Sequence, residues 1–248
     1  MYFLVTAGGT SEPIDAVRSI TNSATGRLGS LIAERLADLP DTEGVFYVCG
    51  KGALCPATVK VEIIPVTDTA ELEIVVKAVL LENRIDGIIH SMAVSDYRVH
   101  AVTTPQLLAK DIFALGASNE AAIARIIRET AGVNRDIKLS SDEKNLVLVL
   151  EPTIKIISLF HQLSPSTLVV GFKLLDKVPH DVLIDTAFSL LQKNHCEYVL
   201  ANDAQDISGD KHIGYLVGKD KSVVRYEDKQ SIACGIVQHL TNVLKGIL

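Results

Sequence analysis

The residues best suited to chemistry lie in one loop near the start of the chain. The stretch "TAGGTSEPIDAVRSITNSATGRLG", Thr6 to Gly29, is rich in glycines and hydroxyls and also carries Arg18 and Asn22. Long loops inside compact domains are uncommon and are often functional. A guanidinium binds phosphate or carboxylate, and an amide donates to a developing oxyanion. Taken singly, Arg18 fits a surface charge and Asn22 a helix cap; together they favour a ligand site.

The glycines of this loop allow two interpretations. Gly8 and Gly9 follow an apolar strand, and Gly26 and Gly29 share one face at the start of a predicted helix. They can admit a phosphate to the amides of the helix start, or they can serve only a tight turn and helix packing. The dinucleotide fingerprint GxGxxG is absent, because Pro13 and a detour separate the glycine pairs.

Two further segments offer charged groups. Asp96 in "AVSDYR" stands just past an apolar strand and can accept from a ribose hydroxyl or a base amine, or help to hold a metal. A simple Asx-turn is the alternative for this residue. Lys138 in "DIKLSS" stands beside two hydroxyls, as a triphosphate partner would, or is a solvated lysine.

The elements that must position these residues alternate between short Val- and Ile-rich runs and helical patterns. Runs such as "GIIH" and "LVVGF" are continuously apolar, which is typical of parallel strands buried on both faces. The pattern predicts an α/β fold, a three-layer, Rossmann-like, doubly wound and mostly parallel sheet. The predicted strands are Tyr2–Thr6, Val45–Cys49, Val61–Pro65, Gly87–Ser91, Leu146–Leu150, Leu168–Phe172 and Tyr198–Ala201. The predicted helices are Gly26–Ala37, Thr69–Glu82, Asn119–Thr130, Thr153–Leu163, His180–Asn194 and Gln230–Leu244.

In such a sheet, ligands bind beyond the carboxyl ends of the strands. The segments "TAGGTSEP", "HSMAVSDYR", "EPTIK" and "GFKLLDK" follow four of the predicted strands and should meet there. Two regions break the alternation. Residues 99–135 predict a helical insertion, and "IGYLVG" with "SVVRY" predicts a small C-terminal β-hairpin. With no repeat or linker, residues 1–248 are expected to form a single domain.

Composition limits the possible partners. The 248 residues carry a net charge of −6 and a pI of about 5.6, which does not suit a nucleic-acid binder. No apolar run suits a membrane span, and the start of the chain predicts a strand rather than a signal peptide. The four cysteines form no CxxC pair and the histidines no metal motif, so we expect reduced thiols, a cytoplasmic location and no zinc site.

In chain order, "LVTAGGTSEPIDAVRSITNSATGRLG", "AVSDYR", "KLSS", "VVGF" and "LANDA" resemble the phosphopantothenate–cysteine ligase family, also called phosphopantothenoylcysteine synthetase, in its stand-alone bacterial form. The resemblance covers nearly the whole chain, and its first segment is the most specific. It implies that CTP, with ATP as the alternative, activates the carboxylate of 4'-phosphopantothenate in the presence of Mg²⁺. Pyrophosphate leaves, and the amine of L-cysteine attacks the acyl nucleotide to give an amide and CMP. The resemblance also implies a homodimer.

The resemblance assigns roles residue by residue. It places Asn22 on the acyl intermediate, Arg18 near the pantothenoyl group and Lys138 at the phosphates, as the catalytic set. No residue is assigned to a metal. The residues expected at the nucleotide or the intermediate are Gly8, Gly9, Gly26, Ala93, Asp96, Lys138, Pro152, Thr153, Ile154, Lys155, Phe172 and Lys193. Where relatives carry two lysines one helical turn apart, this chain has Ser189 and Lys193.

Two other functions remain open on these residues. An NAD(P)-dependent reductase would share the architecture, but it needs an early ribose-binding acidic residue and a YxxxK motif on a helix. "YVCGK", Tyr47 to Lys51, has that spacing but falls on a predicted strand. A non-catalytic nucleotide-binding module would keep the glycine loop, but it need not keep Arg18, Asn22, Asp96 and Lys138 together.

Overall fold

Six of the apolar runs form parallel strands at the centre of a nine-stranded sheet. The computed structural model describes residues 1–133, 144–208 and 211–247, and all structural statements concern these residues. The parallel strands lie in the order β5-β4-β1-β6-β9-β10, which is the strand order of a Rossmann fold and confirms the predicted class. They are β1 (Tyr2–Ala7), β4 (Gly44–Gly50), β5 (Val61–Val66), β6 (Gly87–His90), β9 (Leu168–Leu175) and β10 (Tyr198–Asp203).

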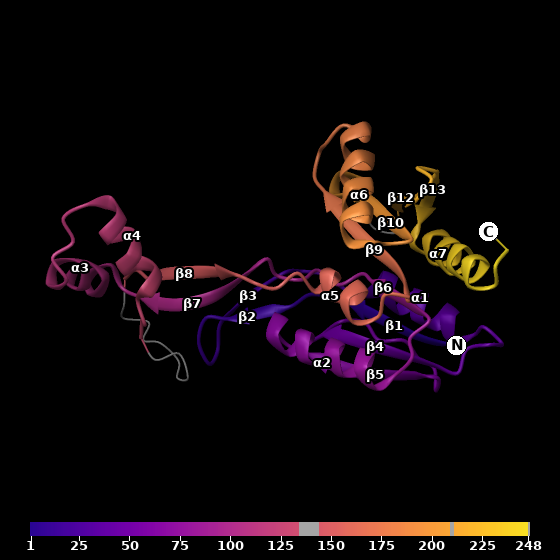
Figure 1. Cartoon of the computed structure of the whole chain (residues 1–248), viewed down its shortest axis with the longest axis horizontal. Helices are drawn as coiled ribbons and strands as arrows, with labels where there is room; N and C mark the ends of the chain where they lie inside the picture. Colours follow the sequence, from indigo (N-terminus) through magenta and orange to yellow (C-terminus); the bar gives the residue numbers. More distant parts are fainter. Residues whose placement is uncertain (134–143, 209–210, 248) are drawn as a thin grey trace.

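Helices cover both faces of this sheet, so that the core has two halves (Figure 1). Along β1, Leu4 points to one half while Phe3 and Val5 point to the other, as the alternation of a strand requires. One half is closed by α1 (Arg27–Ala37) and α7 (Lys229–Leu244). The other half is closed by α2 (Thr69–Glu82), α5 (Ile156–Leu163) and α6 (His180–Asn194). This is the expected three-layer arrangement.

The predicted C-terminal hairpin is confirmed, and it extends the main sheet. β12 (Lys211–Gly218) pairs antiparallel with β10, and β13 (Val223–Asp228) pairs with β12. A short turn of 3₁₀ helix, η1 (Ala204–Asp206), and β11 (Ile207–Ser208) lead into the hairpin. The antiparallel strands therefore finish one edge of the parallel sheet.

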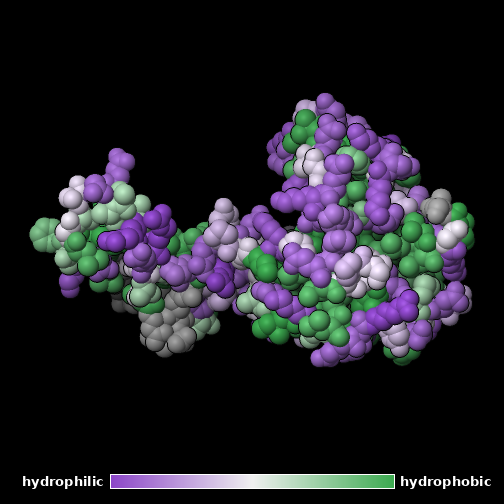
Figure 2. Space-filling view, viewed as in Figure 1, coloured by the Kyte–Doolittle hydropathy of each residue, from purple (hydrophilic) through white to green (hydrophobic). Residues whose placement is uncertain are grey.

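An arm projects from the body of the molecule (Figure 1). It consists of an antiparallel ribbon, β7 (Tyr97–Thr103) and β8 (Val147–Pro152), with α3 (Pro105–Ala114) and α4 (Glu120–Glu129) at its far end. Figure 2 shows apolar surface over α3, where Phe113 and Leu115 are largely exposed. The arm is thus a separate, partly apolar projection of the same chain.

The arm corrects two expectations. The segment 99–135, expected to be helical, begins with strand β7 before its two helices. The run Leu146–Leu150 was expected in the main sheet, but it lies in β8 and pairs only with β7 among the described strands. The sequence misled because a short apolar run looks the same in a fully buried strand and in a half-buried ribbon.

The long N-terminal loop is itself folded. Within it, β2 (Ser11–Pro13) and β3 (Ser19–Thr21) pair as a small antiparallel hairpin. The sequence analysis missed these strands, because three residues are too few to show a period. The hairpin brings the end of the loop back toward its beginning, which sets up the site described below.

Close packing at Gly29 joins α1 to β1. A Cβ at this position would lie 2.5 Å from Cβ of Ala7 and 2.7 Å from Oγ of Ser91. The predicted close approach of the helix start is therefore confirmed, since no side chain fits between helix and strand.

We predict that Gly29→Ala lowers the free energy of unfolding by about 1–3 kcal/mol through overpacking, measured by urea denaturation. The neighbouring Ser30→Ala is the matched control. The Ser30 hydroxyl is buried and has no hydrogen-bond partner among the described residues, so its removal should leave stability equal or higher. Equal stability of wild type and Gly29→Ala would contradict the close-packing argument.

Candidate active site

The candidate site lies at the point where the strand order reverses, between β1 and β6. Here the loop after β1 and the loop after β6 bind each other through their backbones. Ala93 N donates to Gly8 O at 2.8 Å, and Thr10 N donates to Ala93 O at 3.2 Å. The Thr10 hydroxyl adds a buried hydrogen bond to the Ser95 hydroxyl at 2.9 Å. Ligands of doubly wound sheets bind at this position.

The glycines are required by close backbone contact. A Cβ on Gly9 would lie 1.7 Å from Asn22 O, and a Cβ on Gly50 would lie 2.1 Å from Gly9 O. Gly8 and Gly26 have φ of +77° and +72°, which other residues rarely adopt. Gly26 has no side chain to cap α1, and the first amide of the helix, Arg27 N–H, donates to the Thr25 hydroxyl at 3.4 Å.

Asn22 faces the loop after β6. Its Nδ2 donates to Val94 O at 3.1 Å, and its backbone N–H donates to Thr10 O at 3.1 Å. The alternative role of helix cap is excluded, because α1 begins after Gly26 and has no side-chain cap. Among the described residues, the Asn22 amide makes one hydrogen bond, through one N–H of Nδ2, so its other N–H and its Oδ1 can contact a ligand.

Arg18 is held at the turn of the β2–β3 hairpin. Its Nε and Nη2 donate to Oδ2 of Asp15 at 2.9 and 2.5 Å, and Oδ1 of Asp15 accepts from two backbone amides of the turn. The Asp15 carboxylate is fully buried, while the Arg18 side chain is 42% exposed. The pair therefore orders the turn, and Arg18 does not line the pocket that contains Asp96.

A pocket of about 230 Å³ brings together four of the predicted nucleotide residues: Asp96, Ile154, Lys155 and Phe172. Lys155 Nζ lies 2.5 Å from Asp96 Oδ1, and both side chains are mostly exposed. Thr153 fixes the chain beside them, since its N–H donates to Asp96 O at 3.0 Å and its hydroxyl donates to Ser95 O at 2.5 Å. The predicted helix over 153–163 begins at Ile156 instead, which leaves residues 153–155 extended at the pocket.

Pro152 and Thr153 also line a smaller neighbouring pocket, of about 180 Å³, together with Arg98. The segment "EPTIK" therefore reaches the site as predicted, although the strand before it belongs to the arm. Ala93, through its two backbone hydrogen bonds, supports the loop that carries Asp96.

His90 lines the pocket of about 230 Å³ that contains Asp96, and it was not among the predicted site residues. Its ring is buried, Nδ1 is 2.7 Å from the Thr6 hydroxyl, and Phe160 packs edge-on against it. Burial lowers the pKa of His90 to about 4, so the imidazole is neutral near pH 7. Its place at the end of β6, just before the loop to Asp96, was the available signal.

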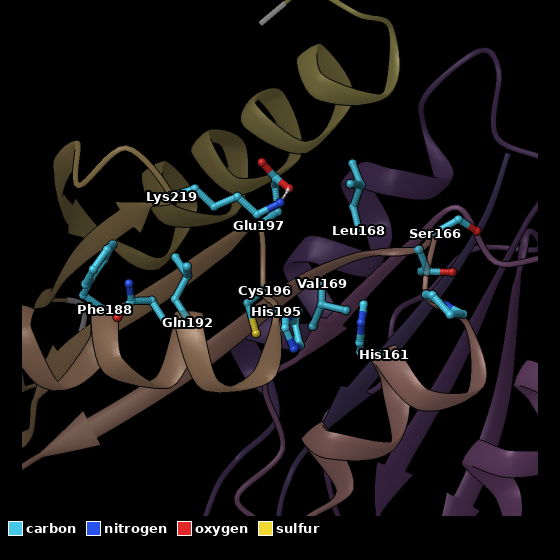
Figure 3. A pocket seen from close by; sticks show the side chains of 13 residues that line it. His161, Ser166, Leu168, Val169, Phe188, Gln192, His195, Cys196, Glu197 and Lys219 are labelled. Atoms are coloured by element: carbon cyan, nitrogen blue, oxygen red, sulfur yellow. Dashed lines mark hydrogen bonds and ion pairs between the residues drawn. The ribbon is translucent and has the colours of Figure 1, made fainter.

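Two predicted residues lie elsewhere. Lys138 is outside the described residues. Lys193 is exposed in the last turn of α6, close to the amino end of β10. It does not line the Asp96 pocket. Its neighbour Gln192 lines a different pocket of about 520 Å³, which contains stacked His161 and His195 and is shown in Figure 3.

Within residues 1–133, 144–208 and 211–247, no group of three or more His, Cys, Asp or Glu side chains is arranged to hold a metal ion. No helix in these ranges has both the length and the apolar character needed to cross a membrane.

The sheet order and the switch-point pocket define a doubly wound α/β protein of the nucleotide-binding type. The chain belongs to the family described as "DNA/pantothenate metabolism flavoprotein C-terminal domain", whose profile matches residues 1–116 and 120–244. This confirms the resemblance found in the sequence at the level of the family.

Solved structures and curated proteins agree with this assignment. A DNA/pantothenate metabolism flavoprotein from Streptococcus pneumoniae is 34% identical, with a TM-score of 0.81 over 98% of this chain and 99% of that one. The coenzyme A biosynthesis bifunctional protein CoaBC of Thermococcus kodakarensis is 30% identical over 217 residues, 88% of this chain and 45% of that protein. CoaBC of Methanocaldococcus jannaschii is 27% identical over 248 residues, 98% of this chain and 51% of that protein. The chain thus spans about half the length of these curated relatives.

The neutral His90 predicts a pH dependence of stability. Because its pKa is lowered on folding, the unfolded chain binds the proton first, and stability falls as the pH drops from about 6.5 toward 4. Between pH 7 and pH 5 this lowers the free energy of unfolding by about 2 kcal/mol. For His90→Asn, we expect the free energy of unfolding, measured by urea denaturation, to fall by about 2 kcal/mol less than that of wild type over this interval.

The buried His212 serves as the comparison, since burial also lowers its pKa to about 4. His212→Asn should also reduce the fall in the free energy of unfolding between pH 7 and pH 5, and the doubly substituted protein should reduce it further. A profile that His90→Asn leaves unchanged would show that folding does not lower the pKa of His90.

Proposed function

We propose that this chain is a phosphopantothenate–cysteine ligase that acts in coenzyme A biosynthesis. The observation that carries the proposal is the meeting of Asn22 with the loop of Asp96 at the switch point of the sheet. Membership of the family and the two CoaBC relatives support the same activity. In the proposed reaction, the carboxylate of 4'-phosphopantothenate attacks the α-phosphorus of the nucleotide and pyrophosphate leaves. The amine of L-cysteine then attacks the acyl carbon, and the nucleoside monophosphate leaves.

The residues divide between the two halves of this reaction. Asp96, Lys155 and Phe172 line a pocket for the nucleotide, with Phe172 offering a ring face for the base. The exposed ion pair of Asp96 and Lys155 contributes little stability, so a nucleotide can replace it at low cost. Asn22 donates to the acyl oxygen on the other side of the Asp96 loop, where negative charge develops. Lys138 at the phosphates stays a prediction from the resemblance.

Mg²⁺ fits this site as a partner of the substrate. Magnesium is commonly held by one or two carboxylates together with substrate phosphates, and Asp96 is the exposed carboxylate of the pocket. When bound, the ion would neutralise charge on the phosphates. The chain's own residues orient the two substrates and leave the nucleophiles to the substrates themselves. CTP is the proposed nucleotide, with ATP as the alternative.

The alternative reductase loses its main support. The Tyr47 hydroxyl donates to Leu54 O at 2.7 Å and to Gly26 O at 3.3 Å, so it is engaged with backbone on strand β4. Burial raises its pKa further above the ordinary value. A catalytic tyrosine of a reductase needs a lowered pKa and a free hydroxyl.

We also propose a homodimer. Among the described strands, β7 and β8 pair only with each other, and Val133 N donates to Val102 O of β7 at 2.7 Å. Such ribbons are marginally stable alone, and the exposed Phe113 and Leu115 add apolar surface to the same arm. The arm is therefore the part of the surface best suited to meet a second copy.

Pyrophosphate release tests the proposed activity. Purified protein is incubated with 4'-phosphopantothenate, Mg²⁺ and either CTP or ATP, with and without cysteine. Release that requires phosphopantothenate, followed by amide and nucleoside monophosphate once cysteine is added, would establish the ligase and its nucleotide. Absence of release with both nucleotides, from folded protein, would favour the non-catalytic nucleotide-binding module.

For Asn22→Ala we predict that pyrophosphate is still released in the first turnover but that amide formation with cysteine slows by about 100-fold, as for loss of an oxyanion donor. Rapid-quench separation of acyl nucleotide and amide measures both steps. Asn83→Ala, at the end of α2, is the matched control and should behave as wild type. Amide formation at the wild-type rate would remove Asn22 from the mechanism.

For Lys155→Ala we predict an increase of roughly tenfold in KM for the nucleotide, because a charge-assisted contact is lost, with KM for phosphopantothenate unchanged. Steady-state pyrophosphate release at varied substrate measures both constants. Lys245→Ala removes a comparable exposed pair, with Asp41, on a different part of the surface and should change neither. An equal rise in both KM values would argue against a nucleotide-specific role.

A further inference from the structure

Two thiols touch each other beside the glycine loop. Sγ of Cys49, at the end of β4, lies 3.9 Å from Sγ of Cys55, in the loop that follows. Cys49 is buried, whereas Cys55 is exposed to solvent. The other two cysteines, buried Cys196 and exposed Cys234, are natural controls.

The two thiols differ in reactivity. Burial, with a smaller contribution from the neighbouring Cys55, raises the pKa of Cys49 to about 12. Thiolates rather than thiols attack, so the exposed Cys55 is the group that reacts first with a reagent from solution. Once Cys55 is held in a mixed disulfide, Cys49, with its sulfur 3.9 Å away, is the resolving thiol.

The loop that carries Cys55 also supports the glycine loop. Leu54 N donates to Thr25 O at 2.9 Å, and the buried Tyr47 hydroxyl connects Leu54 O with Gly26 O. Ala53 packs where Gly8 and Gly26 leave room, because a Cβ on either glycine would come within 2.9 Å of the Ala53 Cβ. Movement of Cys55 must therefore move the contacts that hold the start of α1.

We propose that Cys49 and Cys55 form a reversible disulfide with small disulfide compounds as oxidants, and that this disulfide displaces the loop beneath Gly8 and Gly26. A disulfide bond is about 2 Å long, so the two sulfurs must approach by about 2 Å. Cys49 lies in the packed sheet, so most of this movement falls on the loop of Cys55.

The chemistry proceeds by two exchange steps. The Cys55 thiolate attacks one sulfur of the small disulfide, an S–S bond to Cys55 forms, and one small thiolate leaves. Cys49 then loses its proton to solvent and attacks the Cys55 sulfur, which releases the second small thiolate. The two protein thiols are oxidised by two electrons, and the small disulfide is reduced to two thiols. Excess small thiol reverses both steps.

The expected consequence is slower turnover, a point that rests on the proposed function. A displacement of about 1 Å at a reacting group can cost about 100-fold in rate, so we expect the disulfide to slow pyrophosphate release by up to about 100-fold. The disulfide itself and the displacement of the loop do not depend on that function.

Glutathione redox buffers test the proposal on the full chain. Wild type is equilibrated with oxidised and reduced glutathione, alkylated and mapped by mass spectrometry, and amide hydrogen exchange is followed at Leu54 and over residues 24–30. We expect a linked Cys49–Cys55 peptide, a fall from four alkylated thiols to two, and faster exchange at Leu54. Reduced glutathione should restore all three readouts.

Variants separate the two thiols. Cys49→Ala should trap glutathione on Cys55, Cys55→Ser should form neither product, and Cys234→Ser should behave as wild type. Since Cys55 is exposed, Cys55→Ser keeps the test valid even where Cys49→Ala folds poorly.

Two results would overturn the proposal: no linked peptide at any ratio of the buffer, or a linked peptide with unchanged exchange at Leu54. Failure of the reduced protein to release pyrophosphate would instead count against the ligase. The mass and exchange readouts would still decide the question of the disulfide.

Discussion

The arrangement of the site depends on backbone packing at Gly9. Gly9 packs between the backbones of Asn22 and Gly50, where no Cβ fits. A Cβ on Gly9 would lie 1.7 Å from Asn22 O, and a Cβ on Gly50 would lie 2.1 Å from Gly9 O. A side chain at either glycine would push the loops apart, and the bonds from Asn22 to Thr10 and Val94 would break. The approach of bare backbone therefore brings the amide of Asn22 to the switch point of the sheet.

The charges of the site differ in how firmly they are held. Asp15 is fully buried and bound by Arg18 and by two amides, so removal of one partner would leave a costly unpaired charge. Asp96 and Lys155 are exposed, and their ion pair is weak enough to be exchanged for contacts with a ligand. His90 adds no charge to the pocket near pH 7, because burial keeps its ring neutral. The structure thus holds the turn firmly and leaves the charged pair of the Asp96 pocket free to exchange partners.

The arm and the site form one continuous structure. β7 begins directly after Asp96, and β8 ends at Pro152, directly before Thr153 and Lys155. The register that pairs Tyr97 with Pro152 therefore also sets the distance between Asp96 and Lys155. A change in the ribbon would therefore act on the pocket of Asp96 and Lys155 through two covalent connections.

The sequence by itself determined the layered fold and the glycine loop, because hydrophobic period and glycine position are local properties. The meeting of "AVSDYR" with "EPTIK" was also predicted, but from a strand that the structure places in the arm rather than in the main sheet. It did not determine that Leu146–Leu150 lies in an arm, since a short apolar run fits either a sheet or a ribbon until its partner strand is known. It also did not reveal the neutral His90, the contact of Cys49 with Cys55 or the remote position of Lys193. Burial and contact between distant segments exist only in the folded chain, so the tertiary structure alone decided them.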